Sequence, residues 1–286
     1  LSQGAGALGV GILIDRAGDD TTTSYLYSQG FGGPSSVGLL LDVRGDNQRN
    51  ARGKYPSSYG TEGEFSSFSV GSGLGFRSLD LGKTKAAGGV GVLLDCAGDD
   101  HVEVGEFGYG VGYFVGSGIV RDVAGNDEVQ ASRYGIATGA HYGLGIVLDD
   151  SGDDLWSNAH TASCAGNWDL TLSYLFDGEG DDRYLAAGIG LGSATITSLA
   201  VLVDGAGRDS YQNAGVYCFG NGGHEEDVER GTRCVSIFAD LGGEQDEYPP
   251  LGLVPPPANG VEALRRRTDT KAGSTKETGL GLFIDR

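Results

Sequence analysis

Aspartate recurs at fixed intervals along this chain, in a pattern that indicates cation binding. One aspartate ends each copy of an apolar motif of the form Val-Gly-Val-Leu-Leu-Asp. These aspartates are Asp15, Asp42, Asp95, Asp122, Asp149, Asp177, Asp204 and Asp240. We number each copy from this residue, position 0, and in most copies a second aspartate stands at position +5. The +5 aspartates are Asp20, Asp100, Asp127, Asp154, Asp182 and Asp209.

The spacing of the copies predicts that these carboxylates are stacked. Successive position-0 aspartates are 27, 53, 27, 27, 28, 27 and 36 residues apart, and a period near 27 with one turn per copy is typical of a solenoid. Coils stacked at about 4.8 Å would bring equivalent carboxylates close enough to repel by about 1 kcal/mol in a water-like dielectric. Oxygen-rich clusters of this kind suit Ca²⁺, which takes six to eight oxygen ligands. We therefore expect Ca²⁺ at the +5 aspartates.

A second interpretation needs no ion. Aspartates in tight turns accept hydrogen bonds from nearby backbone amides. Position 0, where the strand passes into the turn, is especially suited to that role. The residues alone leave both interpretations open.

The turns also resemble RTX repeats, whose nonapeptide reads Gly-Gly-x-Gly-x-Asp-x-apolar-x. The matching stretches are Gly98-Asp99-Asp100-His101-Val102, Gly125-Asn126-Asp127-Glu128-Val129, Gly180-Asp181-Asp182-Arg183-Tyr184 and Gly207-Arg208-Asp209-Ser210-Tyr211. The resemblance covers about a fifth of each repeat. It implies a β-solenoid in which Asp100, Asp127, Asp154, Asp182 and Asp209 hold Ca²⁺ between successive coils.

The residues before each position-0 aspartate have the β-branched composition of a strand. Positions −5, −3 and −1 are apolar in most copies, and we expect this face to lie on the core. Position +3 is Gly in all eight copies, which indicates a turn at positive φ. Because 27 residues make three sides of about nine residues each, we predict an all-β, three-sided parallel β-solenoid.

Position −2 lies on the other face of the strand from positions −5, −3 and −1, and it is also apolar. Its members are Leu13, Leu40, Leu93, Val120, Val147, Leu175, Leu202 and Phe238. We expect these side chains to form a Leu/Val stripe on the outer side, where an apolar patch is typical of a contact. The expected occupant of the stripe, or of the solenoid ends, is the Pro-rich tail, a second copy or another protein. Alternatively, the chain's own loops cover the stripe.

The period also divides the chain. Residues 1–246 are predicted to form the solenoid, with an insertion at about 47–89 and an irregular loop at 219–233. The insertion is either a degenerate coil or a loop. Residues 247–278 form a Pro-rich and basic excursion. Residues 279–286 repeat the opening motif as a final solenoid strand, and the lack of any Met leads us to expect a processed protein or a segment of one.

Charge and cysteine content limit the partners and the compartment. The chain has 39 acidic and 20 basic residues, a net charge of −19, which argues against nucleic acid as a partner. No apolar run approaches the roughly 20 residues that a membrane span requires. Cys218 and Cys234 flank the irregular loop and form either a disulfide, in an oxidising compartment, or two buried thiols.

Signatures of catalysis are weak. The four histidines, His101, His141, His160 and His224, occupy different repeat positions, and HExxH, P-loop and Gly-x-Ser-x-Gly motifs are absent from the sequence. The run His224-Glu225-Glu226-Asp227 is a further candidate metal site. The aromatic residues Tyr113, Tyr142, Trp156 and Trp168 are candidates for a glycan-binding groove or for stacking in the core.

These features favour a non-enzymatic, extracellular or cell-surface β-solenoid that is stabilised by Ca²⁺. We expect it to serve as a structural, adhesive or assembly module. Two alternatives remain open. One is a secreted polysaccharide-acting enzyme or carbohydrate-binding β-helix, and the other is a filament or surface-layer subunit.

Overall fold

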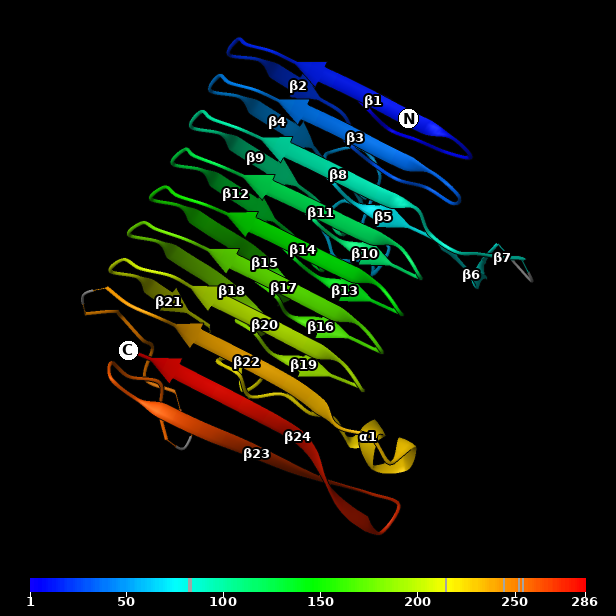
Figure 1. Cartoon of the computed structure of the whole chain (residues 1–286). Coiled ribbons are helices and arrows are strands. Elements are labelled where there is room, and N and C mark those ends of the chain that lie inside the picture. Colours follow the sequence, from blue (N-terminus) through cyan, green and yellow to red (C-terminus); the bar gives the residue numbers. More distant parts are fainter. Residues whose placement is uncertain (82–83, 214, 244, 252, 254) are drawn as a thin grey trace.

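The chain folds into a parallel β-solenoid, which confirms the predicted fold class (Figure 1). The computed structural model describes residues 1–81, 84–213, 215–243, 245–251, 253 and 255–286, with the backbone alone at 78–81 and 84. Three parallel sheets run along the molecule and form the three sides of the coils. The N-terminus lies at one end of the stack, and the last strand lies near the other.

The first side carries the repeated apolar motif. Its strands, in spatial order, are β1 (Val10–Asp15), β3 (Val37–Asp42), β8 (Val90–Asp95), β11 (Ser117–Asp122), β14 (Leu144–Asp149), β17 (Leu172–Asp177), β20 (Leu199–Asp204), β22 (Cys234–Asp240), β24 (Ser274–Asp285) and β23 (Glu262–Lys271). Identical repeat positions pair in register, for example Asp42 with Asp95 and Asp204 with Asp240. The register therefore places the position-0 aspartates in one column.

The other two sides are built from shorter strands. The second side consists of β2 (Thr21–Thr23), β4 (Gln48–Ala51), β9 (His101–Val104), β12 (Glu128–Ala131), β15 (Leu155–Ser163), β18 (Arg183–Gly190) and β21 (Ser210–Gln212). The third consists of β5 (Gly73–Leu74), β10 (Gly112–Tyr113), β13 (Gly139–Ala140), β16 (Asn167–Trp168) and β19 (Ala194–Thr195).

The irregular segments are attached to this regular stack. Strand β3 pairs directly with β8, so the extra residues of 47–89 belong to a single coil. Within that coil, β4 and β5 keep the regular second and third sides, and the hairpin β6 (Phe76–Leu81) and β7 (Thr84–Ala86) follows. Residues 219–233 contain the helix α1 (Glu225–Arg230).

The C-terminal segment closes one end of the stack. Strand β23, within the predicted excursion 247–278, pairs antiparallel with β24, which already begins at Ser274. In Figure 1 this hairpin lies at the end of the ten-stranded sheet opposite β1. Among the described residues, no helix combines the length and apolar character needed to cross a bilayer.

The predicted orientation of the first-side strands is wrong. Position −2 points into the core, and Leu93, Val147 and Leu175 are almost completely buried. Positions −5, −3 and −1 point outward, and Ile12 and Ile14 are 59% and 56% exposed. The Leu/Val stripe is therefore a core column, and the outer face carries the larger number of aliphatic side chains.

Glycine explains this inversion. Position −4 shares the inner face with position −2, and the third side approaches it closely. A Cβ added at Gly38 would lie 1.9 Å from the carbonyl oxygen of Phe31, and one at Gly91 would lie 2.2 Å from that of Ser72. In most coils the inner face thus consists of glycine, one apolar residue and aspartate, and in three later coils Ser173, Ala200 and Ser236 take the place of the glycine. This low apolar content gave no sign in the sequence that the face is buried.

Candidate metal centre

The turn after each first-side strand is fixed by backbone amides that donate to aspartate side chains of neighbouring coils. The amide of Asp100 donates to Oδ1 of Asp127 at 2.7 Å, and the amide of Asp127 donates to Oδ1 of Asp154 at 2.6 Å. The same bond links the later coils through Asp182 and Asp209 at position +5 and through Asp246 at position +6. The turn-capping interpretation is therefore correct for one oxygen of these +5 carboxylates.

A parallel ladder at position +4 is exposed and runs in the opposite direction. The amide of Asp99 donates to Oδ1 of Asp46 at 3.0 Å, and the amide of Asn126 donates to Oδ1 of Asp99 at 2.8 Å. Each turn is thus held by its preceding coil through position +4 and by its following coil through position +5.

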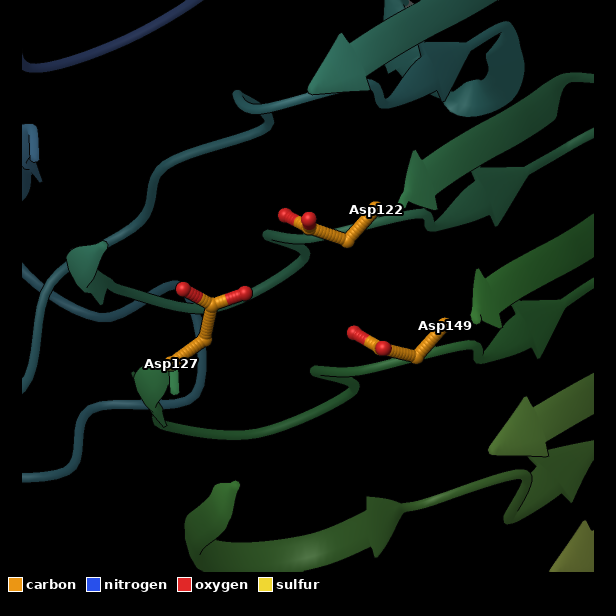
Figure 2. A group of neighbouring side chains, drawn as sticks. All are labelled: Asp122, Asp127 and Asp149. Carbon is orange, nitrogen blue, oxygen red and sulfur yellow. The ribbon is translucent and has the colours of Figure 1, made fainter. Parts of the chain in front are cut away.

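The +5 ladder faces the column of position-0 aspartates across the inside of the turn. Figure 2 shows one such group, in which Asp122 and Asp149 lie at the ends of β11 and β14, and Asp127 lies opposite them. Each residue contributes one oxygen, and these atoms lie within 4.8 Å of one another. Among the described residues, five consecutive groups have this form. They are Asp122–Asp127–Asp149, Asp149–Asp154–Asp177, Asp177–Asp182–Asp204, Asp204–Asp209–Asp240 and Asp240–Asp246–Asp285.

Most of these carboxylates keep a buried oxygen that no protein group bonds. Oδ2 of Asp127, Asp154 and Asp182 and Oδ1 of Asp122 and Asp204 are examples. Buried polar atoms are normally paired, and leaving one unpaired costs about 1–3 kcal/mol, or more for a charged group. The orphaned oxygens are therefore consistent with a ligand inside the turns.

Burial has a large electrostatic effect on the same groups. It raises the pKa of Asp122, Asp127 and Asp149 to about 8, and neighbouring aspartates add to the shift. The pKa of Asp154 is raised to about 9, mainly by burial and then by Asp149. Without a cation, the groups would hold shared protons near neutral pH rather than a full set of negative charges.

In the coils nearer the C-terminus, side-chain donors on the second side stabilise some of these buried carboxylates. The indole of Trp156 donates to Oδ2 of Asp177 at 2.8 Å, and the hydroxyl of Tyr184 bridges Asp177 and Asp204 at 2.9 and 2.7 Å. Burial raises the pKa of Asp177 only to about 6, because Trp156 and Tyr184 lower it. The donors bond Oδ2 of Asp177, whereas its Oδ1 remains unpaired.

One turn contains its own cation. Arg49 occupies position +7 of the second coil, where later coils have Val102, Val129, Trp156 and aromatic residues. Its Nη2 lies 2.8 Å from Asp42 and 2.7 Å from Asp95, the position-0 residues of adjoining coils. Position +5 of that coil is Asn47 rather than aspartate. The guanidinium thus lies between the two carboxylates that, in later coils, form a group with a third one.

Arg49 remains charged in this interior position. Burial lowers its pKa, but Asp100 and Asp95 raise it, and the net change is upward. Its Nε also lies 3.3 Å from Oδ2 of Asp100. The first coils therefore use an arginine where the five groups that follow carry only carboxylates.

The six predicted ligands fall into three situations. Asp127, Asp154, Asp182 and Asp209 each belong to one of the five groups. Asp100 is paired with Arg49. Asp20 lies exposed in the first coil, where Asp15 raises its pKa.

Sequence reasoning did not place the position-0 aspartates among the ligands, although each group contains two of them. It also missed Asp246 and Asp285. Asp246 lies six rather than five residues after Asp240, and Asp285 ends a strand recognised only as a copy of the opening motif. The equal spacing of the two aspartate columns was the available signal for position 0.

The other predicted polar groups have structural partners. His224 caps α1 by accepting the amide of Glu226, and Asp227 accepts bonds from Thr197. Cys218 and Cys234 are free thiols, and burial raises the pKa of both to about 12. The disulfide alternative is therefore not realised in this structure.

The five groups can hold metal ions, and their ligand set consists of oxygen alone. Carboxylates without nitrogen or sulfur donors select hard cations such as Ca²⁺, Mg²⁺ or Mn²⁺. Comparison of the chain with protein-family models, curated proteins and solved structures finds no match. The assignment of a function therefore depends on the geometry of the turns.

Proposed function

We propose that this protein is a structural β-solenoid whose turns bind a column of Ca²⁺ ions, and that it works outside the cell or on its surface. The observation that carries the proposal is the replacement of an aspartate group by Arg49. Where a protein cation lies between two position-0 aspartates, position +5 is the neutral Asn47. Where no arginine is present, as with Asp122 and Asp149, position +5 is a third carboxylate.

Calcium fits this column better than magnesium. Three carboxylates supply only part of a coordination shell, and Ca²⁺ accepts a flexible set of six to eight oxygens that water can complete. Magnesium requires a smaller octahedral shell and usually retains several waters. Extracellular Ca²⁺-binding modules work at millimolar calcium, where even sites of modest affinity are loaded, and this supports an extracellular location.

The test compares two neighbouring aspartates that differ in position. Asp154 lies on the +5 ladder and belongs to the group Asp149–Asp154–Asp177, whereas Asp153 lies on the exposed +4 ladder. Asparagine at position +5 keeps the capping bond, since Oδ1 of Asn47 accepts the amide of Asp20 at 3.0 Å. Asp154→Asn therefore removes the charge without removing the bond, and Asp153→Asn is a matched control.

We expect the wild type and Asp153→Asn to bind several Ca²⁺ ions in equilibrium dialysis, and Asp154→Asn to bind at least one fewer. The melting temperature should rise with millimolar Ca²⁺ because an ion bound only by the folded state stabilises it. The proposal is wrong if chelator and millimolar Ca²⁺ give the same melting curve for the wild type. If the protein bound Mg²⁺ in preference to Ca²⁺ at equal concentration, the proposed ion would change but the proposed site would stand.

A second candidate function is carbohydrate binding, which is favoured by an aromatic cleft of about 330 Å³ lined largely by residues of the insertion 47–89. Tyr59, Phe68, Phe107 and Tyr113 line it, and Phe68 stacks on Phe107 at 4.4 Å between ring centroids. Of the other aromatic candidates, Trp156 is completely buried and therefore stacks in the core. Titration calorimetry with neutral oligosaccharides tests this function, with Tyr113→Ala as the variant expected to lose the heat of binding.

A further inference from the structure

The outer face of the ten-stranded sheet is an extended aliphatic surface. We define it by positions −5, −3 and −1 of the nine parallel strands and refer to it as the outer aliphatic face. Its three columns are Val10, Val37, Val90, Ser117, Leu144, Leu172, Leu199, Val235 and Leu280; then Ile12, Leu39, Val92, Ile119, Ile146, Tyr174, Val201, Ile237 and Leu282; then Ile14, Leu41, Leu94, Arg121, Leu148, Phe176, Val203, Ala239 and Ile284.

This face is open to solvent in the monomer. Figure 1 shows the strands β1 to β24 in front, and no described element crosses them. The first row, Val10, Ile12 and Ile14, is between 56% and 71% exposed. Most residues of the inner rows are half-buried, because the side chains of the strands on either side shield their flanks.

The face is almost free of charge, although the protein has a net charge of −19. Arg121 and Ser117 are the polar exceptions among the three columns. The guanidinium of Arg121 lies 2.6 Å from Asp150 and is therefore compensated at the edge of the turn. The exposed acidic ladder at Asp99, Asp153 and Asp181 lies in the turns, beyond the ends of the strands. Two copies of this acidic protein can thus meet at this face without opposing like charges.

The dimensions of the face match a stable protein–protein interface. Six residues at about 3.3 Å give a width of roughly 20 Å, and nine strands at about 4.8 Å give a length of roughly 40 Å. The product is about 800 Å² per partner, the area of a standard interface. An interface composed almost wholly of aliphatic side chains is typical of a permanent homodimer.

We propose that two copies of the protein pack face to face through the outer aliphatic face. Two sheets can approach to about 10 Å, with their side chains interdigitated, as in a β-sandwich. The same face serves both copies, so the assembly is a closed, two-fold dimer rather than an open filament. A phospholipid surface is the less favoured occupant, because a net charge of −19 opposes anionic lipids, and Arg266, which borders the face on β23, is paired with Glu277.

The proposed dimer is independent of Ca²⁺ binding by the aspartate groups. The aspartate groups lie inside the turns, on the opposite side of the sheet from the outer aliphatic face. Loss of the dimer with intact Ca²⁺ binding, or the reverse, would therefore separate the two proposals.

The test places charge at the centre of the face. Val92→Lys/Ile146→Lys alters two outward residues in the middle column, and Val216→Lys alters an exposed apolar residue in the loop after β21, away from this face, as the control. Sedimentation velocity at micromolar concentration should give twice the chain mass of 29.5 kDa for the wild type and the control. The double lysine variant should sediment as a monomer, with a Kd raised about 100-fold or more.

Val92→Thr/Ile146→Thr provides a milder version, because threonine suits a strand and leaves the fold less perturbed. It should shift the dimer toward monomer with an unchanged circular dichroism spectrum. A monomeric wild type at micromolar concentration would overturn the proposal. So would a dimer that survives both double variants, which would place the contact at the solenoid ends. Binding of a monomeric wild type to phosphatidylcholine vesicles, abolished by the lysines, would assign the face to lipid instead.

Discussion

Oδ1 of Asp127 accepts the backbone amide of Asp100 at 2.7 Å, while its Oδ2 lies buried without a hydrogen-bond partner. One carboxylate thus has two separate oxygens with two separate environments. The first joins neighbouring coils through their turns. The second faces the position-0 aspartates and is the ligand atom that we propose for the cation. Turn capping and ion binding are therefore compatible in one residue.

The stability of the metal-free protein should fall as pH rises. Burial raises the pKa of Asp122, Asp127 and Asp149 to about 8, above the unfolded value near 3.9. A raised pKa in the folded state means that the stabilising protonated form is complete below about pH 4 and is lost as pH passes through about 8. In excess chelator, we expect the melting temperature to fall by about 10 °C or more between pH 5 and pH 8.5.

Calcium should reverse this dependence, because ion binding requires ionised carboxylates and displaces their protons. The stabilisation by millimolar Ca²⁺, measured by scanning calorimetry, should be small at pH 5 and large at pH 8.5. A melting temperature that rises with pH in chelator would contradict the unfavourable burial of these charges.

Substitutions at Arg49 and Asn47 can introduce the residues that later coils have at these two positions. Arg49→Val alone leaves Asp42 and Asp95 buried without their cation, and we expect it to lower the free energy of unfolding by about 3–5 kcal/mol. Asn47→Asp/Arg49→Val copies the arrangement of Asp127 and Val129. The double variant should bind one additional Ca²⁺ per chain in equilibrium dialysis and recover stability when calcium is added. An unchanged ion count would show that the arginine does not stand in for an ion.

The turn glycine should tolerate no side chain. A Cβ at Gly98 would lie 2.0 Å from the carbonyl oxygen of Gly45, at a φ of +139°. We expect Gly98→Ala to lower the free energy of unfolding by more than about 3 kcal/mol in urea denaturation. Gly53 is the control, because its φ of +100° is also positive but no atom lies within 4 Å of the added Cβ. Equal losses for the two alanine variants would mean that backbone strain, and not contact between coils, dominates.

The hydroxyl of Tyr184 should contribute measurably through the two carboxylates that it bridges. Its oxygen lies 2.9 Å from Oδ2 of Asp177 and 2.7 Å from Oδ2 of Asp204, and its single proton can be donated to one of them at a time. Tyr184→Phe keeps the stacking on Tyr211 but removes the donor, and we expect a loss of about 1.5–3 kcal/mol near neutral pH. The loss should shrink at pH 4, because Asp177, whose pKa is raised to about 6 by burial, is then protonated. A pH-independent loss would indicate altered packing instead.

Local sequence pattern was sufficient to predict the coil length, the first-side strands and the turn glycines. Each depends on interactions between neighbouring residues or between equivalent residues of adjoining coils, such as Asp42 and Asp95. A constant period converts spacing along the chain into a constant register. For the same reason, the placement of Asp127, Asp154, Asp182 and Asp209 in one column could be predicted before the fold was known.

The orientation of the strands and the membership of each aspartate group were decided only by the tertiary structure. Both faces of the first-side strands are apolar, so alternation could not tell Leu93 from Val92. The deciding contact is non-local, since the third side approaches Gly91 so closely that only glycine fits on the inner face. Because Gly91 lies on the inner face, the position-0 aspartates also point inward, beside the +5 aspartates. The fold also places Arg49, which lies on the second side of the coil, between Asp42 and Asp95. Nothing in the spacing of the sequence indicated that these three residues would be in contact.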